Sequence, residues 1–285
     1  MKQVVFISGK GGTGKSTVVA SLAKYVNNKV LADCDVDAPN LHILLENDII
    51  AKEDFIGAKE AYIDKDKCIE CGKCREVCRY DAISSDYVVN SIKCEGCNAC
   101  TLVCPVDAIT LNEVKIGEIY DSKTKYGMFS HALLDIGSDG SGKIVTEVKK
   151  RAKEYVKGKD YTLVDGSPGI GCVVIASITG ADAVVIVAEA TKSGQSDLER
   201  VLKVAQHFGI NSYVCINKYD LNTSVTKDIT KFCTLNNVKV IGKIPFEPKI
   251  VKALQQFKTP MDDDDLKHIK DEIINMWNKL EREMN

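Results

Sequence analysis

The fold is decided by one stretch, Gly9-Lys10-Gly11-Gly12-Thr13-Gly14-Lys15-Ser16, which joins an apolar segment to a segment with helical spacing. Residues 2–8 before it are rich in β-branched side chains, which predicts a buried strand. Residues 15–27 after it carry apolar side chains at helical spacing, which predicts a helix. A loop of the pattern G-x-x-x-x-G-K-S between a strand and a helix is typical of a phosphate-binding turn.

Each residue type in this loop has a physical task in phosphate binding. Glycines let backbone N–H groups curl around phosphate oxygens, and the N-terminus of the following helix adds positive potential. We expect Lys15 to reach the β- and γ-phosphates and Ser16 to coordinate Mg²⁺. The predicted nucleotide-binding set in this part of the chain is Gly9, Lys10, Gly11, Gly12, Thr13, Gly14, Lys15, Ser16 and Thr17.

Short apolar strands alternate with helical segments along most of the remaining chain. Strands are predicted at 29–32, 161–164, 183–188, 213–216 and 238–241, and helices at 143–157, 196–208, 223–235 and 247–257. This alternation indicates βαβ units, so we expect an α/β fold with a doubly wound, mostly parallel sheet. A last amphipathic helix, with Leu266, Ile273 and Leu280 on one face, is expected to pack on the domain, with membrane-surface binding as the alternative.

Composition excludes several classes of protein. The chain has 285 residues and a net charge of −2, which gives no basic face for nucleic acid. No apolar run approaches the ~18 residues of a membrane helix, so no integral membrane segment is expected. The first residues do not resemble a signal peptide, and we predict a cytoplasmic protein.

Eight of the twelve cysteines lie between Cys68 and Cys104, in a segment that repeats itself after 26 residues. Such a duplicated unit predicts a small insert at 59–118, flanked by two parts of the main domain at 1–58 and 119–285. Residues 117–142 are rich in glycine and serine and are expected to form a long loop. The two runs have the spacing C-x₂-C-x₂-C-x₃-C, which is typical of [4Fe–4S] ligands, whereas zinc is the structural alternative.

In such runs the fourth cysteine ligates the cluster of the other run. The predicted ligands of cluster one are therefore Cys68, Cys71, Cys74 and Cys104. Those of cluster two are Cys94, Cys97, Cys100 and Cys78. The insert resembles a bacterial two-cluster ferredoxin of small α+β fold, with Arg79 in place of the usual proline after the first run.

Lys10 makes the loop resemble the deviant Walker A sequence K-G-G-x-G-K-[ST] of the MinD, Mrp and nitrogenase iron protein group of P-loop ATPases. The resemblance implies a homodimer in which Lys10 contacts nucleotide across the interface, as an arginine finger does. It also implies catalytic roles for Lys15 and Asp35, with Asp35 positioning the attacking water. Asp33 and Asp165 would help Ser16 to hold Mg²⁺, and Asp37 is a further candidate for either task.

The base of the nucleotide is expected to lie near two later loops. Asn217-Lys218-Tyr219-Asp220 alone would suggest guanine recognition, but the resemblance implies that Asn217 and Lys218 lie at adenine. Pro245, Phe246 and Glu247 match the second base-side loop of the group, so ATP or ADP is the expected nucleotide. Cys172 lies seven residues after Asp165, where the nitrogenase iron protein has a cluster ligand, which suggests a metal site shared between subunits.

Together these features predict an ATP-hydrolysing iron–sulfur protein that couples nucleotide state to electron transfer through two [4Fe–4S] clusters. One alternative is an Mrp-type ATPase for cluster assembly, although the chain has no C-x-x-C after Cys104. A MinD-like positioning ATPase is the other. A redox or iron–sulfur client is implied by the first two, but the residues do not identify it.

Overall fold

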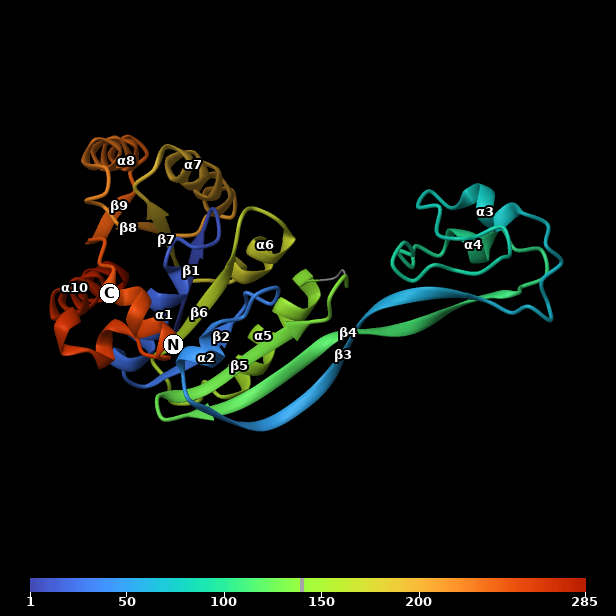
Figure 1. Ribbon diagram of the computed structural model, residues 1–285, viewed down its shortest axis with the longest axis horizontal. Coiled ribbons are helices and arrows are strands. Elements are labelled where there is room, and N and C mark those ends of the chain that lie inside the picture. The colour runs from blue at the N-terminus through green and yellow to red at the C-terminus, as the bar shows by residue number, and fades with distance from the viewer. Residues whose placement is uncertain (139–140) are drawn as a thin grey trace.

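The computed structural model describes residues 1–138 and 141–285 and contains a nine-stranded sheet in the order β3-β4-β5-β2-β6-β1-β7-β8-β9 (Figure 1). Six of its parallel strands were predicted, and their buried positions are filled mainly by the apolar runs seen in the sequence. They are β1 (Lys2–Ser8), β2 (Lys29–Asp33), β6 (Tyr161–Pro168), β7 (Ala183–Glu189), β8 (Ser212–Asn217) and β9 (Lys239–Ile244). The mostly parallel, doubly wound sheet predicted from the sequence is confirmed.

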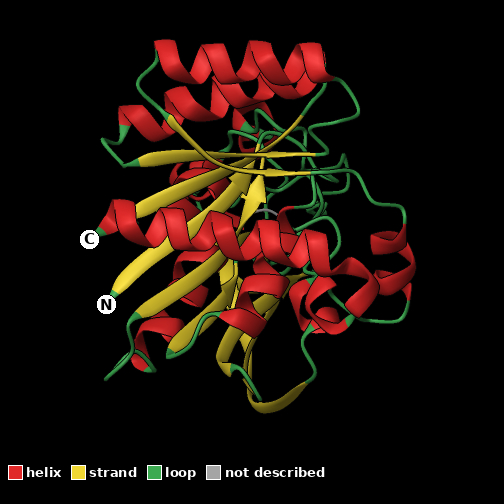
Figure 2. Cartoon of the chain, turned by 90° about the vertical axis from the view of Figure 1, so that its left-hand side faces the viewer, coloured by secondary structure: helices red, strands yellow, loops and turns green. Residues whose placement is uncertain are grey.

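Helices cover both faces of this sheet (Figure 2). One face packs against α1 (Lys15–Tyr25), α2 (Leu41–Leu44), α9 (Lys249–Gln255) and α10 (Lys267–Met284). The other packs against α5 (Ser141–Glu154), α6 (Cys172–Ile178), α7 (Lys192–His207) and α8 (Thr223–Leu235). The apolar stripe of α10 lies in the first core, with Ile273 and Leu280 fully buried, so the expected packing of the last helix is confirmed. No helix among the described residues is both long and apolar enough to cross a membrane.

The sheet continues on one side into three strands that the sequence did not predict. These are β3 (Asn47–Ile63), β4 (Ile109–Thr124) and β5 (Gly127–Leu134). β5 runs parallel to β2, whereas β3, β4 and β5 pair antiparallel. The prediction of a loop over 117–142 is therefore wrong, because most of that segment is tied into backbone ladders; residues 139 and 140 of it lie outside the described residues.

β3 and β4 extend beyond the sheet as a two-stranded ribbon, which carries the cysteine-rich segment away from the main body (Figure 1). The pairing of β4 with β5 stops at Gly117, and Phe55 lies opposite Gly117 on β3. We call the outer part of the ribbon, residues 56–63 and 109–116, the arm. The expected domain limits at 58 and 118 thus fall inside two continuous strands.

The arm projects from the carboxyl edge of the parallel strands, on the side of the phosphate loop. The sheet register shows this, since Asp33 at the end of β2 lies beside His131, His131 beside Tyr120, and Tyr120 beside Lys52. β3 continues for eleven residues beyond Lys52, to Ile63. At about 3.3 Å per residue, the arm reaches up to roughly 35 Å past the level of Asp33.

Residues 64–108, which we call the cysteine module, show the 26-residue duplication in their backbone. The short helices α3 (Lys73–Val77) and α4 (Ala99–Leu102) begin at equivalent positions. Positive φ angles occur in matched pairs, at Gly72 and Asn98 and at Asp81 and Asp107, as well as at Glu70 and Gly96. The Asp64 N–H donates to Ala108 O and the Asn90 N–H donates to Ala82 O, so the two halves are bonded in a reciprocal way.

Candidate nucleotide site and cysteine module

The phosphate loop connects β1 to α1 and has the conformation that its glycines predict. Gly12 and Gly14 have φ values of 77° and 90°, in the left-handed region that favours glycine. A Cβ atom on Gly14 would also lie 2.3 Å from Asn217 Nδ2, so a larger residue would collide with the base-side loop. Because α1 begins at Lys15, its first N–H groups face the loop and can bind an anion.

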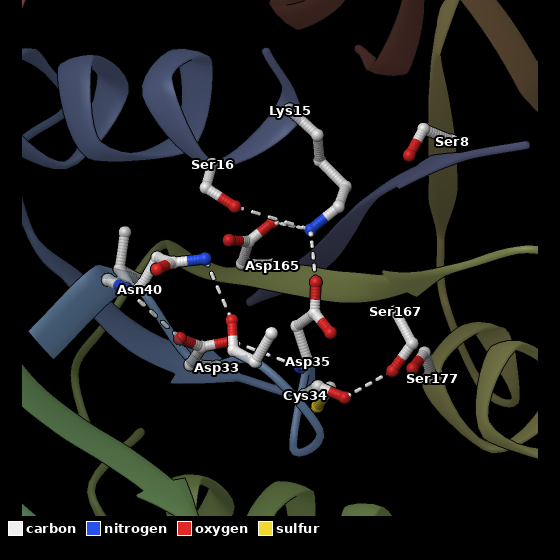
Figure 3. Close-up of polar contacts among 12 residues, drawn as sticks. Ser8, Lys15, Ser16, Asp33, Cys34, Asp35, Asn40, Asp165, Ser167 and Ser177 are labelled. Carbon is white, nitrogen blue, oxygen red and sulfur yellow. Dashed lines mark hydrogen bonds and ion pairs between the residues drawn. The ribbon is translucent and has the colours of Figure 1, made fainter. Parts of the chain in front are cut away.

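Lys15 forms the centre of a buried charge cluster (Figure 3). Its Nζ lies 2.5 Å from Asp165 Oδ1 and 3.5 Å from Asp35 Oδ2, and the Ser16 hydroxyl is 3.4 Å away. Burial disfavours the charged lysine, but the negative charges of Asp165 and Asp35 outweigh it and raise the pKa of Lys15. Burial raises the pKa of Asp35, which the charge of Asp165 raises further. The sequence-predicted Lys15, Ser16, Asp35 and Asp165 are thus brought together.

Asp33 is fully buried beside this cluster and binds backbone amides. Its carboxylate accepts hydrogen bonds from the N–H groups of Asp35, at 3.0 Å, and Leu41, at 3.1 Å. Burial and the nearby charge of Asp165 raise the pKa of Asp33 to about 8. The side chain therefore holds the start of α2 against the end of β2, and its expected part in the Mg²⁺ shell stays a prediction.

The residues present fit a magnesium–nucleotide complex. Asp165 Oδ2 is buried and has no hydrogen-bond partner among the residues that the structure describes, so it offers an acceptor at the end of β6. A buried carboxylate oxygen and the Ser16 hydroxyl are the hard oxygen ligands that Mg²⁺ prefers. A cavity of about 700 Å³ runs from the phosphate loop past Asn217 to Phe246. That volume lies in the range of cofactor sites, which reach 300–1,000 Å³.

The base-side residues lie at the other end of this cavity. Asn217 Nδ2 donates to Thr13 O at 2.7 Å, which ties the end of β8 to the phosphate loop. Lys218, Pro245, Phe246 and Glu247 line the same cavity. Asp220 Oδ1 instead accepts the Phe246 N–H at 2.7 Å. That oxygen joins the loop after β8 to the loop at 245–247, and the expected choice of adenine over guanine stays a prediction.

The Lys10 side chain is bound by Glu189, a residue that the sequence analysis did not predict for the site. Lys10 Nζ lies 2.9 Å from Glu189 Oε2, and Lys218 Nζ lies 2.7 Å from Glu189 Oε1. The two lysines together lower the pKa of Glu189, even though burial opposes this. Its position at the end of β7, at the carboxyl edge of the sheet, was the one available signal.

The cysteine module brings together one of the two predicted ligand sets. A small cavity is lined by Cys94, Cys97 and Cys100 from the second run and by Cys78 from the first. In the other run, Cys68 and Cys71 lie close enough to Cys74 to raise its pKa, which burial already raises. Backbone N–H groups donate to the sulfur atoms of the two last cysteines, from Ala82 to Cys78 at 3.4 Å and from Ala108 to Cys104 at 3.3 Å.

The twelve cysteines form no disulfide in the part of the chain that is described. Within those same residues, no three His, Cys, Asp or Glu side chains converge on a point where one metal ion would be held. Cys172 is exposed at the first residue of α6, and the metal site suggested for it stays a prediction. Cys34, Cys215 and Cys233 are buried in the main body.

A lysine and an acidic residue around a glycine loop, at the carboxyl edge of a parallel sheet, define a P-loop nucleotide-binding protein. The comparison with protein families is more specific, because residues 4–261 match the CobQ/CobB/MinD/ParA nucleotide binding domain. The chain belongs to this family, whose MinD- and ParA-type members are ATPases that bind ATP or ADP with Mg²⁺.

Relatives in sequence come from the archaeon Methanocaldococcus jannaschii. One uncharacterized protein is 39% identical over 224 residues, which cover 77% of this chain and 79% of the relative. A second is 32% identical over 281 residues, which cover 96% and 97%. An uncharacterized ATP-binding protein is 26% identical over 263 residues, which cover 87% and 90%.

Solved structures share the fold at lower sequence identity. The MinC:MinD cell division protein complex of Aquifex aeolicus has a TM-score of 0.60 at 21% identity, covering 98% of this chain and 96% of that one. The MinD protein of Pyrococcus horikoshii, complexed with Mg-ADP, has a TM-score of 0.59 at 16% identity and 98% and 95% coverage. The McdA(D38A)–ATP complex of Cyanothece has a TM-score of 0.59 at 17% identity and 98% and 96% coverage.

Proposed function

We propose that this chain binds and hydrolyses ATP with Mg²⁺, and that its nucleotide state controls electron transfer through two [4Fe–4S] clusters in the cysteine module. The observation that carries the proposal is the cavity lined by Cys94, Cys97, Cys100 and Cys78. It is the crossed ligand set expected of a two-cluster protein. It lies on the same chain as a P-loop site of an ATPase family.

In the ATP site, the chain's own residues change partners when nucleotide binds. Lys15 leaves Asp165 and Asp35 and binds phosphate oxygens, which are the stronger counter-charge. Ser16 and the free Oδ2 of Asp165 would hold the metal ion, which supplies charge neutralisation at the phosphates. Asp35, released from Lys15, is then free to orient the attacking water.

The remaining residues bind the base and close the site. Asn217 and Lys218, with the loop at 245–247, form the adenine end of the cavity. Lys10 is the candidate for contact with nucleotide across a homodimer. For this role it must leave Glu189, to which it is now bound at 2.9 Å.

In the cysteine module, the thiols would hold clusters, which supply one-electron chemistry when bound. Cys68, Cys71, Cys74 and Cys104 form one set, and Cys94, Cys97, Cys100 and Cys78 form the other. Burial raises the pKa of Cys74 and Cys100, so their free thiolates are disfavoured. Metal binding would have to offset the free-energy cost of deprotonating these thiols. The N–H donors from Ala82 and Ala108 would stabilise the negative charge on sulfur. Zinc is the structural alternative for the same thiols.

A positioning ATPase of the MinD type is the second candidate, and the comparisons favour it. The solved proteins that share the fold include MinD cell division proteins, one of them in complex with MinC. In this reading, the nucleotide-dependent dimer would recruit a partner, and the module would act as a sensor. The fold itself is common to both readings.

One set of measurements separates the candidates. The protein is purified without oxygen, its iron and sulfide are counted, and the cluster potentials are measured with and without Mg-ATP. Eight iron atoms per chain and potentials that shift with Mg-ATP support nucleotide-controlled electron transfer. Clusters whose reduction potentials are the same with and without Mg-ATP would favour the positioning role. Rapid transfer of clusters to an apo-acceptor would favour a role in iron–sulfur cluster assembly. A zinc-containing, iron-free protein would refute the electron-transfer proposal.

A further inference from the structure

The row of residues that starts at the nucleotide site continues to the base of the arm. In the sheet register, Asp33 lies beside His131 on β5, and His131 lies beside Tyr120 on β4. Lys52 on β3 is the next residue in the row, and its Nζ lies 5.5 Å from the centre of the Tyr120 ring. A lateral line of side chains thus joins the end of β2 to the outermost strand.

Aromatic rings fill this row and connect it to the segment that follows Asp33. The ring of His131 stacks on those of His42, at 5.4 Å and 2°, and Tyr120, at 5.0 Å and 11°. It also stacks on Phe129 at 4.6 Å. His42 belongs to α2, whose first N–H is bound by Asp33. We call His42, His131 and Tyr120 the ring stack.

The ring stack ends at the point where the arm leaves the sheet. The Tyr120 hydroxyl donates to Glu118, and Glu118 also pairs with Lys115, at 2.8 Å, and Lys52, at 2.9 Å. Lys115 reaches back to Asp54 at 2.7 Å. These four charged residues therefore brace β3 against β4, and Tyr120 is bound directly to them.

The braced segment has the features of a hinge. The β3–β4 register shifts between Phe55 and Ile56 and again between Ile56 and Ala58, as β-bulges do. Beyond Gly117 the ribbon loses β5 and has only two strands, and a two-stranded ribbon is marginally stable in water. We call residues 54–58 and 115–118 the hinge. Small changes in its bracing contacts can alter the direction of the arm.

We propose that the ring stack carries the nucleotide state from residues 33–41 to the hinge, and so sets the position of the cysteine module. This inference rests on the proposed nucleotide binding. When Lys15 exchanges Asp165 and Asp35 for phosphate, the segment from Asp33 to α2 loses its present charge partners and shifts. His42 then moves against His131, and the displacement reaches Tyr120 and its bond to Glu118. His42 and His131 are positioning residues, because they act through the hinge and do not touch the nucleotide cavity.

Hydrogen–deuterium exchange of the full chain tests this, with and without Mg²⁺ and a non-hydrolysable ATP analogue. In the wild type we expect nucleotide-dependent changes both at residues 33–41 and at the hinge. His42→Ala and His131→Leu should keep the change at 33–41. They should reduce the change in opening equilibrium at the hinge by about two- to tenfold, the factor that one aromatic pair contributes.

Two variants serve as matched controls. His131→Phe keeps a stacking ring and should behave as the wild type. His207→Ala removes a ring that packs on Phe208 at 5.2 Å on the far face of the sheet, and should also change nothing. His42 is only partly buried, so its alanine variant remains informative if His131→Leu does not fold.

The outcomes are distinct. A hinge response that survives in both His42→Ala and His131→Leu, or that is missing from the wild type while 33–41 responds, overturns the ring stack as the connection. If exchange in the wild type changes neither at residues 33–41 nor at the hinge when the ATP analogue is added, nucleotide binding itself is refuted. The inference is then refuted as well. Loss of the hinge response in His207→Ala would also count against it, since any ring deletion would then have the same effect.

Discussion

Replacement of His131 by phenylalanine should remove a large part of the acid sensitivity of this fold. His131 is 5% exposed, and its Nδ1 is buried without a hydrogen-bond partner within residues 1–138 and 141–285. Burial, with a smaller contribution from His42, lowers the pKa of His131 from 6.5 to about 4. The folded protein therefore holds His131 neutral in a pH range in which the unfolded chain protonates it.

The sign and size of the effect follow from linkage. Because the folded pKa is the lower one, the stability is fully present above pH 6.5 and is lost as the pH falls toward 4. Each pKa unit corresponds to 1.36 kcal/mol, so the complete loss is of the order of 3 kcal/mol. At pH 5 about 2 kcal/mol of it should be gone. The phenylalanine side chain of His131→Phe has no proton to bind, and it keeps a ring against Phe129 and Tyr120.

The assay is urea unfolding followed by the fluorescence of Trp277, the single tryptophan, which is buried on α10. Wild type and His131→Phe are compared at pH 7.5 and at pH 5. At pH 7.5 we expect the variant to be at least as stable, because a buried unpaired nitrogen is removed. At pH 5 it should gain about a further 2 kcal/mol over the wild type. If the variant and the wild type differ in free energy of unfolding by the same amount at pH 7.5 and at pH 5, the buried, neutral state of His131 is refuted.

Three further substitutions test the sites. Asp165→Asn removes the free carboxylate at the end of β6 and should lower ATP turnover about 100-fold or more while nucleotide still binds, as measured by phosphate release and by nucleotide titration; turnover within threefold of wild type would contradict its role at the metal. Glu189→Gln releases Lys10 and should shift the protein toward the dimer at a given ATP concentration in analytical ultracentrifugation, whereas an unchanged equilibrium would mean that Glu189 does not hold Lys10 back. Cys78→Ser should perturb the cluster of the second run, and Cys104→Ser that of the first, in the EPR spectra of the reduced protein; each serine affecting its own run would exclude the crossed ligand sets.

The parallel core of the fold could be predicted because its strands are short, mainly apolar runs, and β1, β2, β7 and β8 end at a polar residue. Strand 2–8 and the helix after it follow directly from such patterning. β3 gave no comparable signal, since most of its side chains are exposed and its charged residues do not alternate regularly. It is a strand because its backbone pairs with β4, and such a partner cannot be recognised from local hydrophobicity.

Some residues of the site could also be predicted from the sequence, whereas others could not. Lys15 and Ser16 are contiguous in a motif whose spacing encodes their task, and Asp165 follows a recognisable strand. Glu189 lies far from Lys10 in the sequence, and only the packing of β7 beside β1 brings their side chains within 2.9 Å. His42 and His131 are separated by 89 residues and share no motif. Contacts of this kind depend on the three-dimensional fold and leave no spacing pattern.

The length of the arm limits how ATP can influence the cysteine module. The module begins after Ile63 and lies away from the main body at the end of the ribbon (Figure 1). Within one chain, β3 and β4 connect the main body to the module, and they lose the support of β5 beyond Gly117. The hinge also contacts the main body at Lys143, whose Nζ donates to Gly57 O at 2.9 Å. The contacts that set the hinge are the ones most able to decide where the module lies. A chain with a stiff, fully paired arm would bind ATP equally well, but its module would keep one position in every nucleotide state.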